Sequence, residues 1–148
     1  MTENFNCKKL ENPSKFFHSH VSYCENIFLT SGMVSRKDEL TGINIGVKAT
    51  EDSSEGKVYV HDIKLQFMDI VNQLQLICND LDFINSDIRD HILETKVYIV
   101  NVKKYFADFN KVYGEWMGNR NSYPARTTIG VADLPSNVIL EMGFVLSK

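Results

Sequence analysis

The feature that most constrains the fold is a change in the spacing of apolar residues at Asp62. From Ile63 to Leu81 the apolar residues recur at alternating intervals of three and four, which is the stripe of an amphipathic helix. Asp62 directly precedes this stripe and is expected to cap the helix. Because the stripe lasts less than three heptads, it predicts a helix that covers a sheet rather than a coiled coil.

Segments with the composition of β-strands flank this helix on both sides. Residues Val21–Val34 hold two short apolar runs around a turn at Glu25-Asn26, which predicts a β-hairpin ending at Thr30-Ser31-Gly32. Gly32 is expected at a point where backbone must come close to another group. Residues Thr95–Val102 are rich in β-branched side chains and predict a central strand.

Aromatic residues at helical spacing predict a second helix after that strand. They are Phe106, Phe109, Tyr113 and Trp116, and Gly118 provides a C-terminal stop. We interpret this aromatic stripe as part of the core. Farther along, Ala125–Ala132 and Val138–Leu146 are separated by a turn over residues 133–137 and predict a second hairpin.

The resulting order, ββαβαββ, predicts an α+β fold in which two helices pack on one face of a mixed sheet. A chain of 148 residues is expected to form one domain over residues 1–148. Residues 1–17 are interpreted as a polar leader. Residues 35–57 are interpreted as an extended loop or hairpin insertion, with Ile43, Ile45 and Val47 alternating as an edge strand. Because the strands are apolar on both faces, the helix-free face is expected to meet other subunits in a closed oligomer.

Charge and composition exclude several classes of function. The formal net charge is -3, and Lys and Arg are scattered along the chain, so no nucleic-acid partner is expected. The longest apolar run, Val138–Leu146, is interrupted by Glu141 and is too short to span a bilayer, so no membrane partner is expected. The first residues lack the apolar stretch of a secretory signal, which favours a cytoplasmic location, with mitochondria as the alternative.

The spacing of cysteines and histidines does not predict a metal site. Three cysteines without CxxC spacing are interpreted as reduced thiols. In a strand, His18 and His20 would share one face, as two metal ligands require, but no third ligand accompanies them. We therefore expect no metal.

Arg126 is the first candidate for a binding role. Strand alternation places it on one face with Thr128, Gly130 and Ala132, small residues that leave space beside a guanidinium. The planar fork of an arginine matches a carboxylate bidentately, so this face is suited to an α-keto, α-imino or α-amino acid. A surface or interface salt bridge is the alternative explanation for an arginine in a strand.

Glu141 is the second candidate, because it lies in the middle of an apolar strand. Burial is expected to raise its pKa, and a carboxyl group poised near neutrality can move a proton or orient a water molecule. The alternative is a buried ion pair, with Arg126 as one partner. Whether Arg126 and Glu141 share a face depends on the strand register, which the sequence leaves open.

Residues 124–135 (PARTTIGVADLP) and 138–142 (VILEM) resemble the C-terminal signature of the Rid, or YjgF-type, family of reactive-intermediate imine/enamine deaminases. That signature consists of P-A-R, a strand ending V-A-x-L-P, and an aliphatic run ending E-M or E-I. The triplet Thr30-Ser31-Gly32 and Asn110 in the second helix also agree with the family. The resemblance extends over Val21–Val34 and Asp62–Leu146.

The resemblance implies a chorismate-mutase-like fold, a homotrimer with ligand clefts between subunits, and no cofactor. It implies that Arg126 binds the substrate carboxylate and that Glu141 positions water for attack on the imine carbon. The cleft would be lined by Ser31, Gly32, Asn110, Thr128 and His18. The implied reaction hydrolyses 2-aminoacrylate and similar 2-imino acids to 2-keto acids and ammonia.

The chain also departs from the family pattern. His18 stands where active members commonly carry a tyrosine, Thr127 where a smaller or apolar residue is usual, and Thr128 where cysteine is frequent. The segment from residue 35 to 57 is longer than is typical. A catalytically weak trimer that binds small carboxylates or protein partners for regulation is therefore the alternative function, and a purely structural interaction protein is a third.

Overall fold

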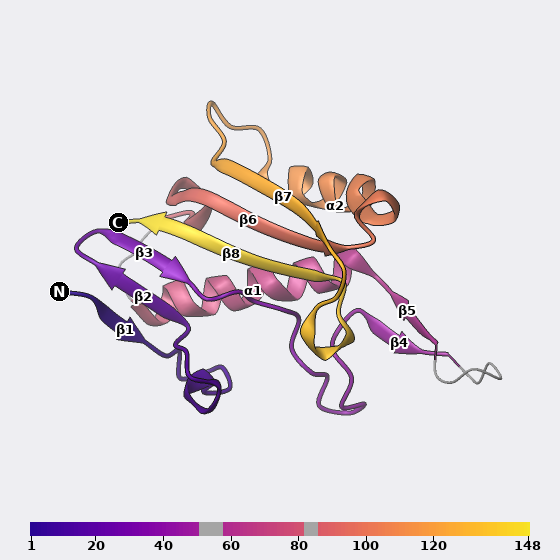
Figure 1. The fold of residues 1–148 in the computed structure, drawn as a ribbon. Coiled ribbons are helices and arrows are strands. Elements are labelled where there is room, and N and C mark those ends of the chain that lie inside the picture. The colour runs from indigo at the N-terminus through magenta and orange to yellow at the C-terminus, as the bar shows by residue number, and fades with distance from the viewer. Residues whose placement is uncertain (51–57, 82–85) are drawn as a thin grey trace.

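The computed structural model describes residues 1–50, 58–81 and 86–148. A six-stranded mixed sheet has the order β1-β2-β3-β8-β6-β7, and both long helices cover the same side of it (Figure 1). The strands of this sheet are β1 (Glu3–Phe5), β2 (Val21–Cys24), β3 (Ile27–Thr30), β6 (Ile92–Val100), β7 (Ala125–Val131) and β8 (Leu140–Ser147). The helices are α1 (Ile63–Leu81) and α2 (Val102–Met117). The predicted α+β architecture is confirmed.

The apolar stripe of α1 forms the centre of the core. Phe67, Ile70 and Leu74 are completely buried against the sheet and α2. The N–H of Leu65 donates to the Asp62 carboxylate at 3.1 Å, so Asp62 caps the helix as predicted. Burial of this stripe, rather than helix propensity, supplies most of the stability of such a helix.

The aromatic stripe of α2 is confirmed in part. Phe109 and Tyr113 are buried and pack edge-on against Phe67 of α1. Gly118 ends the helix with a φ of +65°, a conformation that glycine adopts without strain. Phe106 is exposed instead of buried, because the buried side of α2 passes through Tyr105, one position away.

The predicted hairpin of β7 with β8 is wrong. Strand β7 pairs in parallel with β6, and Arg126 lies opposite Thr95. Strand β8 pairs antiparallel with β6 on that strand's other side, and Glu141 lies opposite Tyr98. The cause is the β6–α2–β7 crossover, which returns the chain parallel to β6. Strand β7 therefore forms the edge of the sheet beside β6. The loop containing η3 (Pro135–Asn137) then carries the chain past β6 into the gap beside β3.

The N-terminal leader is folded onto the sheet and is not a loose extension. Strand β1 pairs with β2, and η1 (Pro13–Phe16) follows it. Cys7 is buried, and its N–H donates to Nδ1 of His20 at 2.9 Å. In turn, the N–H of His20 donates to the Asn6 side chain at 3.0 Å. These contacts attach the leader to the first hairpin.

The insertion begins with a loop and continues as a separate two-stranded ribbon. A bridge joins Lys37 to Asn44, and β4 (Val47–Ala49) pairs with β5 (Tyr59–His61). The ribbon extends beyond the end of the large sheet (Figure 1). The predicted edge strand is therefore confirmed only at Val47, while residues 51–57 lie outside the described part of the chain.

We predict that His20 makes the stability of the protein depend on pH. Its Nδ1 must be unprotonated to accept the Cys7 N–H, and burial lowers its pKa below the ordinary value of 6.5. The stabilisation is therefore complete above pH 6.5 and is lost as the pH falls through the lower pKa of the folded state. Thermal unfolding between pH 7.5 and 5 measures this loss, and His20→Gln, which cannot titrate, should show a smaller decline. Equal declines in both proteins would contradict the prediction.

Candidate functional site

The Arg126 side chain lies on the face of the sheet that the helices cover. Its partner in the register, Thr95, is completely buried and its hydroxyl lies 3.2 Å from the Tyr113 hydroxyl of α2. Nη2 of Arg126 donates to Oδ1 of Asn110 at 2.8 Å, and Cζ lies 4.8 Å from the centre of the Tyr113 ring. The amide and the ring together fix the plane of the guanidinium.

Thr128 joins this group two residues farther along β7. Its hydroxyl is buried, and within the described residues it has no hydrogen-bond partner. The structure thus brings together three of the predicted site residues, Arg126, Asn110 and Thr128. No described carboxylate of the same chain forms an ion pair with Arg126, so neither a surface salt bridge nor the pair with Glu141 is present within the described residues.

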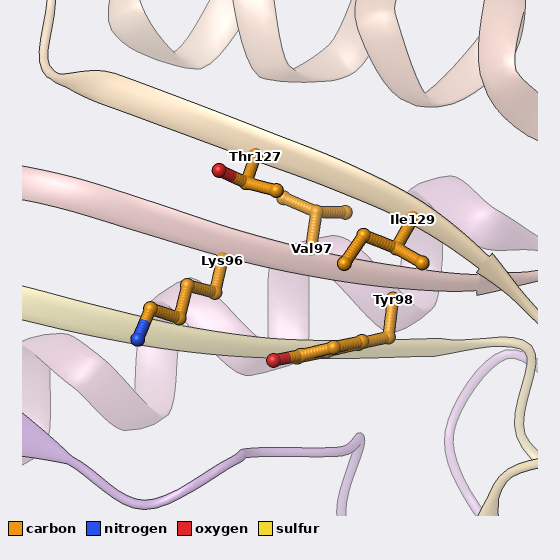
Figure 2. Close-up of a pocket in the computed structure, with 5 residues that line it drawn as sticks. All are labelled: Lys96, Val97, Tyr98, Thr127 and Ile129. Atoms are coloured by element: carbon orange, nitrogen blue, oxygen red, sulfur yellow. The ribbon is translucent and has the colours of Figure 1, made fainter.

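The Glu141 side chain lies on the opposite, helix-free face. Its neighbour Met142 and that residue's partner Val97 are buried beneath the helices, so Glu141 and its partner Tyr98 point the other way. Figure 2 shows the same face, where a hollow of about 160 Å³ is lined by Lys96, Val97, Tyr98, Thr127 and Ile129.

The carboxyl group of Glu141 rests against the backbone of Gly32. A Cβ added to Gly32 would lie 2.0 Å from Oε1 of Glu141, so any larger residue there would force the carboxyl to swing aside. The expectation that Gly32 marks a close approach is confirmed. Burial raises the pKa of the Glu141 carboxyl above its ordinary value of 4.5.

Ser31, Gly32, His18 and Glu141 line one large hollow of about 1200 Å³. The Ser31 hydroxyl donates to the Ser19 carbonyl at 2.6 Å, while His18 is exposed. The hollow lies between the leader and the loop that follows Gly32. Charged side chains of both signs also line this hollow, namely Lys9, Glu11, Arg36, Lys37, Asp38 and Glu39.

Arg126 and Glu141 therefore do not converge within one chain. Strand β6 separates β7 from β8, which places the two backbones roughly 10 Å apart across the sheet, and their side chains leave it on opposite faces. The register that the sequence left open thus sends the two side chains to opposite faces. Two half-sites exist instead: the arginine half-site is Arg126, Asn110 and Thr128, and the glutamate half-site is Glu141, Ser31, Gly32 and His18.

Sequence reasoning missed two residues beside these half-sites. The helical spacing of Tyr113 predicts a core residue, yet its ring also supports the Arg126 guanidinium. Its position three residues after Asn110 was the available signal, because such residues share a helix face. Tyr98 is the cross-strand neighbour of Glu141, and without the register no signal could identify it.

Two features are absent from the described residues. No three side chains of His, Cys, Asp or Glu gather there in a way that could hold a metal ion. In the same residues, no helix is long and apolar enough to cross a membrane.

Comparison with known proteins gives a family match and a shared fold. A sequence profile of the family described as Endoribonuclease L-PSP matches residues 14–146. A search of curated proteins found no match. Among solved structures, yeast Mmf1 is similar with 24% sequence identity and a TM-score of 0.70, over 100% of this chain and 99% of that chain.

Two bacterial structures show the same architecture. YyfA from Yersinia pestis, described as a protein of unknown function of the conserved Rid family, has 18% identity and a TM-score of 0.70, with 100% of each chain covered. Rv2704 from Mycobacterium tuberculosis, a member of the YjgF/YER057c/UK114 family, has 12% identity and a TM-score of 0.68, again over 100% of each chain. At these identities the likeness shows the fold alone.

We predict that Gly32→Ala destabilises the protein through a clash with Glu141. The added methyl group would overlap the carboxyl, which must swing aside, so the cost lies at the low end of overpacking, about 1 kcal/mol. Urea unfolding measures the loss. Gly143→Ala on the same strand as Glu141 is the matched control, because a Cβ there meets nothing within 4 Å. A similar loss of unfolding free energy in both variants would show that the loss does not come from a clash with Glu141.

Proposed function

Because the chain belongs to the YjgF/Rid family, described as Endoribonuclease L-PSP, we propose that it hydrolyses 2-imino and enamine acids to 2-keto acids and ammonia. The observation that carries the proposal is the arginine half-site. There, an amide and an aromatic ring orient a guanidinium that no described carboxylate neutralises. Such a fork binds the carboxylate of a planar 2-imino acid bidentately.

The glutamate half-site supplies the proton chemistry. The oxygen of a water molecule adds to C2 of the iminium as its proton passes to the Glu141 carboxylate. The carboxyl then returns this proton to the amino nitrogen of the tetrahedral intermediate. The C–N bond then breaks as the Glu141 carboxylate takes up the hydroxyl proton of the intermediate, so that ammonia leaves and the 2-keto acid remains. A carboxyl whose pKa is raised by burial is suited to taking up and releasing a proton near neutral pH.

We propose that the two half-sites meet between subunits of a homotrimer. Ile27, Leu29 and Ile129 lie on the helix-free face and are 41% to 47% exposed, which is the apolar surface that a second copy would cover. One copy would contribute Arg126 with Asn110 and Thr128. Its neighbour would contribute Glu141 with Ser31, Gly32 and His18. A small planar acid would then have its carboxylate on one subunit and its reacting carbon beside the other.

The alternative is a trimer that binds small carboxylates without turning them over. His18 favours it, because this side chain is exposed and, by the resemblance to the family, stands where active members commonly carry a tyrosine. Both functions predict that a 2-keto acid such as 2-oxobutanoate binds and raises the melting temperature. Only the deaminase predicts faster loss of an imino acid.

We predict that Arg126→Ala lowers imine turnover about 100-fold or more, because a charge-assisted bidentate contact to the substrate is lost. An amino-acid oxidase generates the imino acid, and trapping by semicarbazide reports how much survives. Lys111→Ala, an exposed cation beside Asn110, is the matched control and should behave as wild type. If wild type and Arg126→Ala show the same imine turnover, the deaminase function is excluded.

We predict that two inactive variants restore activity when they assemble together. Arg126→Ala retains the glutamate half-site and Glu141→Gln retains the arginine half-site. In randomly mixed trimers, about a quarter of the interfaces would combine two intact halves. Co-refolding equal amounts of both and measuring turnover tests this. No recovery, despite confirmed mixing of subunits, would contradict a site shared between copies.

A further inference from the structure

The backbone from Gly32 to Arg36 is held on two sides. On one side it joins β8, where the Met33 N–H donates to the Met142 carbonyl at 2.7 Å and the Met142 N–H donates back at 3.0 Å. On the other side it is bound by two polar side chains of α1, Asp69 and Gln73. The segment thus links the helix layer to the strand that carries Glu141.

Asp69 makes most of the contacts between α1 and this segment. Its side chain is only 4% exposed. Its carboxylate accepts from the Arg36 backbone N–H at 2.7 Å, from Arg36 Nε at 3.0 Å and from Arg36 Nη2 at 2.6 Å. Gln73 Nε2 donates both to Asp69 at 2.9 Å and to the Val34 carbonyl at 2.8 Å. The pair therefore binds the backbone at two points, Val34 and Arg36.

An ion pair at this depth is not explained by stability alone. Removing a carboxylate from water is costly, and apolar residues of similar volume often stabilise a fold as well as a buried ion pair. Apolar side chains cannot, however, fix the position of a backbone N–H and a backbone carbonyl along a helix. Directional hydrogen bonds at Arg36 and Val34 do so.

The position of this segment determines the surroundings of Glu141. Gly32 lies against the Glu141 carboxyl so closely that a Cβ at position 32 would push the carboxyl aside. No hydrogen bond from a described residue orients that carboxyl, which is partly exposed and lines the large hollow. A shift of the backbone at Val34 and Arg36 would therefore change how Gly32 packs against Glu141 and how far water surrounds the carboxyl.

We propose that Asp69 is a positioning residue, which holds the Val34–Arg36 backbone on α1 and thereby keeps Gly32 against the Glu141 carboxyl. Its importance for turnover rests on the proposed deaminase function, in which Glu141 orders the attacking water. Its effect on Glu141 does not depend on that function. Asp69 belongs to neither half-site and acts only through the Gly32–Arg36 segment.

The test measures the titration of Glu141 in Asp69→Asn. Carbon-13 NMR of glutamate-labelled protein, with Glu141→Gln to assign the signal, gives the pKa of this carboxyl directly. In wild type the pKa should lie above 4.5, because burial raises it, and in Asp69→Asn it should move back toward 4.5. The acid limb of the pH–rate profile should shift the same way, with kcat lowered about 10-fold and KM changed less.

Asp87→Asn is the matched control. Asp87 is ion-paired with Arg89 and Arg120 in a different part of the molecule, so its loss should affect stability without moving the Glu141 titration. If Asp69→Asn does not fold, Arg36→Gln breaks the same ion pair from its partly exposed end and is titrated in its place.

An unchanged Glu141 titration in a folded Asp69→Asn or Arg36→Gln protein would overturn the proposal. The same shift in Asp87→Asn would also overturn it, because the effect would then be general destabilisation. A wild-type protein without turnover would refute the deaminase function, whereas the NMR titration would still decide the role of Asp69.

Discussion

Strand β6 is the constraint on which the arrangement of the site depends. It pairs in parallel with β7 and antiparallel with β8, so it separates the strands that carry Arg126 and Glu141. Since side chains alternate along every strand, the register sends these two residues to opposite faces. One chain therefore contains two half-sites, and the proposed chemistry requires a second copy. The exposed apolar residues on the helix-free face suit that requirement, because they are the surface that another copy would cover.

The carboxyl groups of Asp69, which is buried, and Glu141, which is partly buried, have opposite surroundings. The Asp69 carboxylate accepts several hydrogen bonds from Arg36 and Gln73. Glu141 receives none from the described residues and rests on the bare backbone of Gly32. A carboxylate with several donors holds structure, whereas one without donors has a raised pKa and can exchange a proton. In our proposal the first group positions the second, through a segment of five residues that joins α1 to β8.

Much of the fold could be predicted because it depends on local patterns. The stripe from Ile63 to Leu81 and the cap at Asp62 follow from the period of an α-helix, and the turn at Glu25-Asn26 follows from turn chemistry. The leader could not be predicted in the same way. Its polar residues bind distant partners, as Lys8 binds Asp80 through its N–H at 2.9 Å, and such contacts leave no periodic signal in the sequence.

The sequence by itself determined the order of the two long helices and of the strands β2, β3, β6, β7 and β8, the buried face of α1 and the identity of the candidate residues, because side-chain type and spacing are written in it directly. It also determined that Gly32 would mark a close approach, whereas Glu141, expected to be buried, is only partly buried. Only the tertiary structure decided that β6 lies between β7 and β8 and that Arg126 meets Asn110 and Tyr113. The physical reason is that strand pairing is a long-range choice. Backbone hydrogen bonds are alike for all strands, so neighbours and register are set by how the whole chain buries its apolar surface.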